Sequence, residues 1–161
     1  MYIDSNIFIF AAMDQDELGE NCRKILDMIE SDRIQAASSF LVLDEVMWVI
    51  KKNIGKDESV KVSKAALSLP VKWIDVSRSV MIESLDSFQR YNLDPRDCIH
   101  LSSMKNSGIT TIISEDGDFD RVSSVKRLNA ATLIQSFTEE LFEQVSKSGK
   151  KVTKKIDPHE A

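Results

Sequence analysis

The chain contains 161 residues, of which 42% are hydrophobic and 29% are charged, with only 5 glycines and 3 prolines. This length and composition are typical of one globular domain and exclude collagen-like, low-complexity and disordered proteins. The 21 Lys and Arg residues against 26 Asp and Glu residues give a net charge of −5. Affinity for nucleic acids comes mainly from Lys and Arg, so either the partner is not a nucleic acid or bound metal cations reverse the field locally.

Two features of the sequence indicate its compartment. Cys22 and Cys98 lie in predicted helices at no metal-ligand spacing, and two thiols in a chain of this length favour a reducing compartment over a disulfide framework. The chain does not start with a basic segment followed by an apolar one, and no apolar run reaches the ~18 residues that cross a bilayer. We therefore expect a cytoplasmic protein that does not contact a membrane.

The predicted elements begin with a short buried strand at residues 2–4 and 6–10 that ends in a turn. Apolar residues from Leu18 to Ile29 then recur at helical spacing. Further strands are predicted at residues 34–37, 71–76, 110–113 and 124–128. Further helices are predicted at residues 39–53, 57–69, 77–91, 94–105 and 132–147.

Strands that alternate with one or two helices predict right-handed crossovers and a parallel sheet covered by helices on both faces, which is an α/β fold. We expect the domain to occupy residues 1–130. A helix over residues 131–149 is expected to pack on the domain or at an interface. The polar, lysine-rich residues 150–161 are expected to form a disordered tail.

Three carboxylates from distant parts of the chain are predicted at one edge of this sheet, because ligand sites in parallel sheets lie beyond the carboxyl ends of the strands. Asp4 ends the first strand, and Asp116 follows the strand at residues 110–113. Asp97 lies in the first turn of the helix that leads back to that strand.

A fourth carboxylate comes from residues 40–50, which are apolar at every position except Asp44 and Glu45. A carboxylate in such a helix is buried, and no Lys or Arg within the stretch can pair with it. The sequence does not decide which of the two acids faces inward. Clustered carboxylates repel one another unless their pKa values rise or a divalent metal binds, and an all-oxygen cluster favours Mg²⁺ or Mn²⁺. His100 is expected to be a packed or hydrogen-bonded histidine, and zinc is poorly supported.

Each acidic motif also has a structural explanation. Residues 4–6 fit an Asx turn or helix cap, residues 94–97 fit a cap with proline at the first helical position, and residues 114–120 fit an acidic turn. Their common predicted location is the stronger argument for a site.

Four segments, taken together in this order and at these spacings, resemble PIN domains over roughly residues 1–130. The segments are residues 2–6, 43–46, 93–101 and 113–120. The resemblance implies a Rossmann-like, three-layer α/β/α sandwich with a central parallel sheet. Carried over position by position, the acids of the family fall on Asp4, Glu45, Asp97 and Asp116. The supporting polar positions fall on Asn6 and Ser114, with Asp120 outside the metal ligands.

Many PIN domains are metal-dependent ribonucleases, including VapC toxins that a small VapB antitoxin neutralises. The resemblance therefore implies an endoribonuclease that hydrolyses RNA in line with Mg²⁺ or Mn²⁺ held by the four acids, and it implies a homodimer. For a toxin it also implies a small antitoxin partner. Trp48 and Trp73 are expected to lie in the core or at an interface rather than to stack against RNA bases. The cations expected to hold the flanking RNA are Lys51, Lys52, Arg96, Lys105, Arg121, Lys126 and Arg127.

Three other functions stay open. One is a housekeeping RNA-processing nuclease, and another is a module of this fold that binds RNA or protein without cleaving it. The third is a haloacid-dehalogenase-like phosphatase, which is disfavoured because Asn6 stands where such enzymes usually have a second Asp. Chelation separates a catalyst from a binding module, because only the catalyst loses turnover in EDTA.

Overall fold

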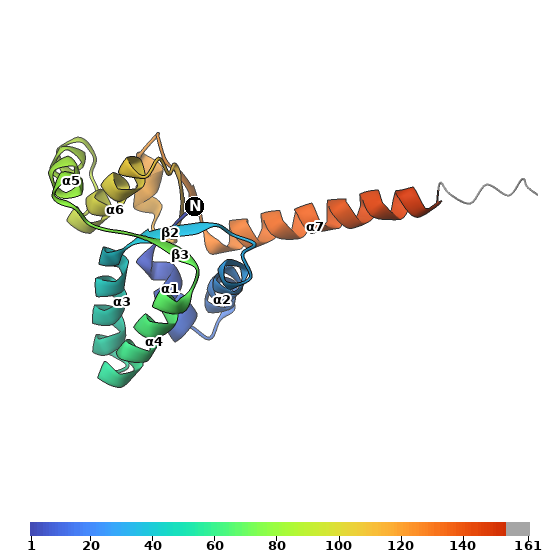
Figure 1. The fold of residues 1–161 in the computed structure, drawn as a ribbon, viewed down its shortest axis with the longest axis horizontal. Coiled ribbons are helices and arrows are strands. Elements are labelled where there is room, and N and C mark those ends of the chain that lie inside the picture. The colour runs from blue at the N-terminus through green and yellow to red at the C-terminus, as the bar shows by residue number, and fades with distance from the viewer. Residues whose placement is uncertain (154–161) are drawn as a thin grey trace, which may run out of the picture.

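The computed structural model describes residues 1–153, and its centre is a five-stranded sheet (Figure 1). The strand order is β3-β2-β1-β4-β5, and every neighbouring pair is parallel. Tyr2 of β1 pairs with Ala37 of β2 and with Ile112 of β4. The predicted α/β class is thus confirmed. The strands are β1 (Tyr2–Ile3), β2 (Ala36–Ser39), β3 (Val71–Ile74), β4 (Thr111–Ile113) and β5 (Lys126–Leu128).

Helices cover both faces of the sheet, with α1 to α4 on one side and α5 and α6 on the other (Figure 1). No helix in the described part of the chain is both long enough and apolar enough to cross a membrane. The helices are α1 (Ser5–Met13), α2 (Glu17–Glu30), α3 (Phe40–Asn53), α4 (Lys56–Ser68), α5 (Arg78–Arg90), α6 (Pro95–Asn106), the 3₁₀ helix η1 (Gly117–Arg121) and α7 (Ala130–Thr153).

The central strands are buried on both faces, and their alternate side chains enter separate cores. Ile3 and Ile113 pack in the larger cluster, with residues of α1, α2 and α3. Tyr2 and Ile112 pack in a smaller cluster with Met104 of α6. Because successive side chains of a strand point to opposite faces, these few residues join the two helical layers.

Residues 6–10 form part of α1, which corrects the strand predicted there. An apolar run without clear periodicity can be a buried strand or a buried helix. Here α1 begins directly after β1, with Asp4 as its N-cap, and its residues Ile7 and Phe8 are fully or almost fully buried. The short helix η1 was also not predicted.

The chain order places a topological switch point between β1 and β4. From β1 the chain builds β2 and β3 on one side, and it then returns to build β4 and β5 on the other side. The segments after neighbouring strands β1 and β4 therefore diverge, which leaves a crevice at their carboxyl ends where ligands of such folds bind.

α7 begins on the body and projects away from it (Figure 1). Leu133 is buried, and Ile134 and Phe137 pack against the larger cluster. Leu141 and Phe142 are exposed. The helix runs to Thr153, so the first residues of the predicted disordered tail are helical. The rest of that tail, residues 154–161, lies outside the described residues.

The corner between α1 and α2 is unusually tight. The Asp14 carbonyl approaches Gly19 so closely that a Cβ added there would lie 2.2 Å from the carbonyl oxygen. One guanidinium nitrogen of Arg23 donates to the carbonyls of Ala11, at 3.0 Å, and Asp14, at 2.7 Å. Glycine is therefore required at position 19 for close approach rather than for an unusual backbone angle.

Candidate active site

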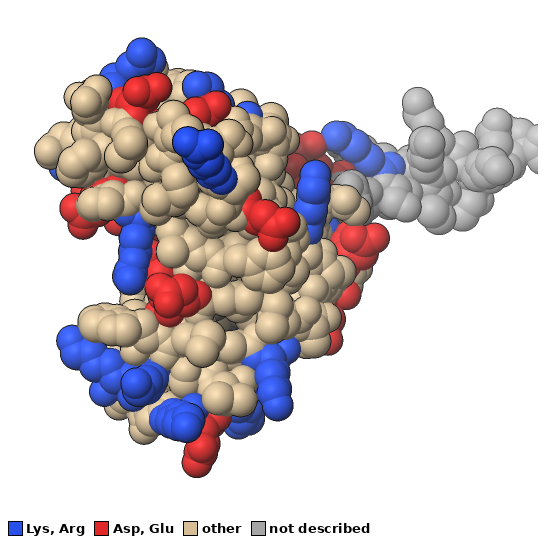
Figure 2. Space-filling view, turned by 60° about the vertical axis from the view of Figure 1, so that its left-hand side comes forward, with Lys and Arg blue, Asp and Glu red and all other residues tan. Residues whose placement is uncertain are grey.

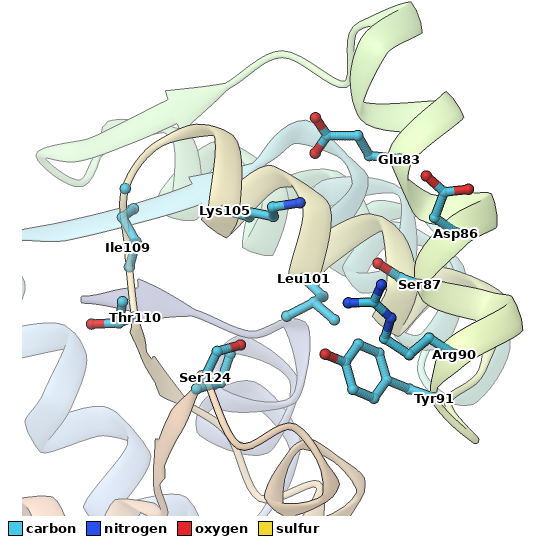
Figure 3. Close-up of a pocket in the computed structure, with 12 residues that line it drawn as sticks. Glu83, Asp86, Ser87, Arg90, Tyr91, Leu101, Lys105, Ile109, Thr110 and Ser124 are labelled. Carbon is cyan, nitrogen blue, oxygen red and sulfur yellow. The ribbon is translucent and has the colours of Figure 1, made fainter.

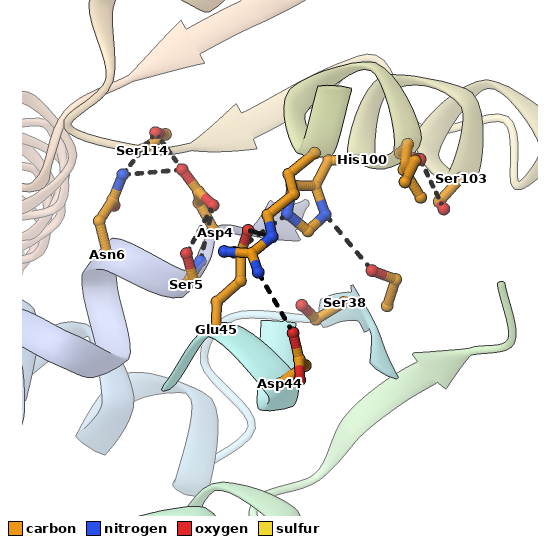
Figure 4. Close-up of polar contacts among 12 residues, drawn as sticks. Asp4, Ser5, Asn6, Ser38, Asp44, Glu45, His100, Ser103 and Ser114 are labelled. Carbon is orange, nitrogen blue, oxygen red and sulfur yellow. Dashed lines mark hydrogen bonds and ion pairs between the residues drawn. The ribbon is translucent and has the colours of Figure 1, made fainter. Parts of the chain in front are cut away.

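Asp4 is the first acid of the site, and the local fold holds its carboxylate in place (Figure 4). It follows β1, caps α1 and is only 4% exposed. Its Oδ1 accepts the Ser5 amide N–H at 2.7 Å, and its Oδ2 accepts Asn6 Nδ2 at 2.7 Å and Ser114 Oγ at 2.5 Å. Burial raises the pKa of Asp4, and the charge of His100 and the hydrogen bond from Ser114 oppose that rise.

Asn6 and Ser114 join the start of α1 to the loop after β4. Asn6 Nδ2 donates to Ser114 Oγ at 2.9 Å, and Asn6 Oδ1 accepts the Glu115 amide at 3.2 Å. Ser114 Oγ also accepts the Asp116 amide at 3.0 Å. These bonds fix Asp4 relative to the loop that carries Asp116, which is how supporting residues orient metal ligands.

Glu45, not Asp44, faces the site. Glu45 is 8% exposed, whereas the Asp44 side chain is 67% exposed. Residues 40–50 contain no Lys or Arg, but two side chains of α6 reach Glu45 from outside that stretch. Arg96 lies 3.6 Å from Glu45 and 3.5 Å from Asp44, and His100 Nε2 lies 3.3 Å from Glu45 Oε2. Burial alone would raise the pKa of Glu45, but the hydrogen bond and charge of His100 bring it below its ordinary value.

His100 is the residue of the site that the sequence did not reveal. It is 1% exposed, and its Nδ1 lies 2.8 Å from the Tyr2 hydroxyl. The Ser39 amide donates to the same hydroxyl at 3.1 Å, and on the other side of the ring His100 Nε2 lies 3.3 Å from Glu45 Oε2. Burial opposes the charged imidazole, but Glu45, Asp4 and Asp97 raise the pKa of His100. The available signal was its position three residues after Asp97, on the same face of α6.

Asp97 and Asp116 are the other two carboxylates that the sequence predicts at the same edge of the sheet as Asp4. Asp97 lies in the first turn of α6, and Asp116 caps η1 by accepting the Asp118 amide at 2.8 Å. Burial, together with the negative charges of Asp116 and Asp4, raises the pKa of Asp97 to about 7. Burial is the largest cause of this rise, and repulsion by Asp116 and Asp4 adds to it.

The donor set fits a divalent cation that prefers oxygen. Asp4, Glu45 and His100 each offer a ligand atom, and these atoms lie within 4.8 Å of one another. Both His100 nitrogens already have partners, since Nδ1 lies 2.8 Å from the Tyr2 hydroxyl and Nε2 lies 3.3 Å from Glu45. Neither Asp97 nor Asp116 belongs to this group of three, although the charges of Asp116 and Asp4 both raise the pKa of Asp97. Carboxylate oxygens are the ligands that Mg²⁺ and Mn²⁺ prefer.

A sequence model of the PIN domain family matches residues 1–125, which is more than half of the chain. The chain belongs to the PIN domain family. No curated protein sequence matches it significantly. Structurally it is similar to the toxin VapC20 of Mycobacterium tuberculosis, which cleaves the sarcin–ricin loop, with a TM-score of 0.65 and 17% identity over 76% of this chain and 94% of that one.

Two toxin–antitoxin structures share the same fold. VapBC2 of Rickettsia felis, bound to a promoter DNA fragment, matches with a TM-score of 0.62 and 16% identity over 80% of this chain and 96% of that one. A toxin–antitoxin complex from Klebsiella pneumoniae matches with a TM-score of 0.57 and 23% identity, over 77% of this chain and 93% of that one. At these identities the likeness establishes the PIN fold and nothing finer.

Asp120 and Arg121, two further residues that we predicted for the site, have hydrogen-bond partners outside the carboxylate cluster. Asp120 pairs with Arg127 through contacts of 2.9 and 2.7 Å, and Arg127 also donates to the Ser114 carbonyl at 3.1 Å. Asp120 thus supports the loop after β4 from outside. Arg121 is held by the Asn92 carbonyl, at 2.7 Å, and by Asp118.

Lys105 does not lie at the carboxylate edge. α6 begins at that edge with Asp97 and ends near Lys105, so the two residues occupy opposite ends of the helix. There Lys105 lines a cavity of about 430 Å³ between α5, α6 and the starts of β4 and β5 (Figure 3). A role for Lys105 in holding RNA at the carboxylates is not supported by this placement.

We expect Ser114→Ala to weaken divalent-metal binding about 10- to 100-fold, because Asp4 Oδ2 and Asn6 lose the hydroxyl that positions them. Isothermal titration with Mn²⁺ measures this change. Ser102→Ala is the matched control, since Ser102 Oγ is also buried but has no hydrogen-bond partner. Equal Mn²⁺ affinity in the two variants would contradict the role of Ser114.

Proposed function

We propose that this PIN domain is a cytoplasmic endoribonuclease that depends on Mg²⁺ or Mn²⁺ and hydrolyses RNA phosphodiester bonds. The observation that carries the proposal is the set of carboxylates at the switch point between β1 and β4, in which Asp4 and Glu45 are buried and Asp97 has a pKa of about 7. An acidic chain can bind a polyanion at such a site once a cation is present. Membership of the PIN family supports the same reaction class.

Asp4, Asp97 and Asp116 would hold the cation, and Glu45 would complete the cluster. When bound, the ion would offset the phosphate charge and acidify a water molecule. Glu45 can orient that water through a carboxylate oxygen, because Arg96 and His100 keep it charged and fixed. His100 lies between the Tyr2 hydroxyl and Glu45, and its role would be to position Glu45.

The proposed biological role is that of the toxin in a VapBC-type pair, with a small antitoxin as partner. The structures from R. felis and K. pneumoniae that share this fold are toxin–antitoxin assemblies. We also propose a homodimer. Met81, Leu85 and Phe88 follow one another at spacings of four and three on α5 and are all exposed, which supplies an apolar stripe for a partner.

The proposal predicts metal-dependent cutting. Purified protein should cleave an end-labelled single-stranded RNA in Mn²⁺ or Mg²⁺ and lose this activity in EDTA, with recovery when Mn²⁺ is restored. Gel electrophoresis of the products measures the result. Cleavage that continues in excess EDTA would contradict the metal requirement. Metal binding without cleavage of any RNA tested would instead favour a noncatalytic module.

A further inference from the structure

A basic surface follows α3 away from the carboxylates. It consists of Trp48, Lys51, Lys52 and Lys56, and we call it the α3 surface. Residues 46–56 contain these three lysines and no Asp or Glu, whereas the whole chain has a net charge of −5. Figure 2 shows Lys and Arg side chains gathered at the lower end of the molecule, where α3 meets α4.

The α3 surface is continuous with the candidate active site. Glu45, Trp48 and Lys52 are spaced i, i+3 and i+7, so they lie along the same side of α3. At a rise of 1.5 Å per residue, Trp48 is about 4.5 Å and Lys52 about 10.5 Å along the helix axis from Glu45. A strand that leaves the carboxylates along α3 would meet Trp48 first and Lys52 next.

Trp48 differs from the other tryptophan of the chain. Trp73 is half-buried and stacks between Phe8 and Phe40, with ring centroids 6.4 and 5.6 Å away. Trp48 is 55% exposed, and Lys52 Nζ lies 4.9 Å from the centroid of its ring. A solvent-facing aromatic ring beside a cation is the combination that binds stacked bases and their phosphates in proteins that hold single strands.

We propose that the α3 surface binds the single-stranded RNA that flanks the cleaved bond, with one base stacked on Trp48 and neighbouring phosphates held by Lys51 and Lys52. This inference rests on the proposed function and names the substrate track of the same site. Stacking tolerates any base, and lysines recognise only the backbone, so the surface adds affinity without sequence preference.

Charge and continuity favour RNA over a protein on this surface. Met47 and Ile54 are also exposed here and would suit an apolar partner. However, residues 46–56 contain three lysines and no acid, and the exposed Asp44, one turn before Trp48, pairs with Arg96 at 3.5 Å. The surface also begins beside the carboxylates where a phosphodiester would be cut. A polyanion that is already held at the site satisfies both features.

The test is RNA binding measured without cleavage. The full chain, in EDTA, is titrated into a fluorescein-labelled 12-nucleotide single-stranded RNA of mixed sequence, and anisotropy reports the Kd. Trp48→Ala should raise the Kd about 10-fold, while Trp48→Phe should retain most of the affinity. Lys51→Gln combined with Lys52→Gln should lower the slope of log affinity against log salt by about 1.4, from two single-strand phosphate contacts.

The control is Lys24→Gln combined with Arg33→Gln, which removes two charges near α2 and should leave the slope unchanged. Unchanged affinity and slope in the Trp48 and lysine variants, in a protein that binds RNA, would overturn this inference alone and leave the α3 surface to a protein partner. Wild-type protein that binds no RNA, either in EDTA or with Mn²⁺ restored, overturns the inference as well. Loss of affinity in these variants of a protein that never cleaves RNA would support the surface and reject the nuclease.

Discussion

Asp4→Asn is expected to reduce metal-dependent RNA cleavage at least about 100-fold. The substitution removes a charged ligand from the cation and leaves the side chain the same size. The amide oxygen can keep the bond from the Ser5 amide, and only the bonds that Ser114 and Asn6 make to Oδ2 must rearrange around the new NH₂ group, so the fold should persist. Initial rates of RNA cleavage in Mn²⁺, with circular dichroism as the check on folding, measure the effect.

The matched control is Asp14→Asn, which removes one charge at the other end of α1, outside the carboxylate cluster. Cleavage by that variant should equal cleavage by the wild type. A folded Asp4→Asn protein that cleaves RNA at the wild-type rate would reject Asp4 as a ligand and, with it, the proposed site.

The second large effect concerns stability without metal. Asp97→Asn should stabilise the metal-free protein at pH 8, although it removes a predicted catalytic residue. The pKa of Asp97 is about 7 in the folded chain and close to 3.8 when unfolded. Between these values the folded state binds more protons than the unfolded state, so the contribution of Asp97 to stability falls as pH rises from about 4 to 7. Below pH 4 both states are protonated, and the variant gains nothing.

The full shift of the Asp97 pKa corresponds to about 4 kcal/mol in the free energy of unfolding. Solvent screening of this partly exposed group reduces the expected gain to about 1–2 kcal/mol. Urea unfolding in EDTA at pH 4, 6 and 8 measures it, with the exposed Asp86→Asn on α5 as the control. Adding Mn²⁺ should then stabilise the wild type more than Asp97→Asn, since only the intact site binds the ion well. A variant no more stable than the wild type at pH 8 in EDTA would refute the repulsion between Asp97 and its neighbours.

Most of the fold could be predicted from the sequence because alternation of strands and helices restricts the topology. The strand β4 and the start of α6 at Pro95 followed directly from β-branched residues and from a proline at the first helical position. Residues 6–10 were assigned to a strand because a run that is apolar on every side has no periodicity to read. In the structure the run belongs to α1, which begins at Ser5 with Asp4 as its N-cap and buries Ile7 and Phe8.

The site could be predicted as far as local rules extend. The predicted carboxyl ends of two strands identified Asp4 and Asp116 as site residues. The apolar character of residues 40–50 identified a buried acid at position 44 or 45. The rotation of α3, and therefore the choice of Glu45, depends on packing against other elements. The role of His100 depends on Tyr2 and Ser39, which lie 98 and 61 residues away in the chain. No spacing in the sequence reports such a contact.

The tight corner at Gly19 and Arg23 affects how the site can move. Helix ends normally fray because their last carbonyls lack partners. At the end of α1 two of these carbonyls accept hydrogen bonds from Arg23, and at the beginning the same helix is held by Asp4 and Asn6. Unwinding of α1 from either end would first have to break these bonds, so Asp4 is presented by a helix that is fixed at both termini.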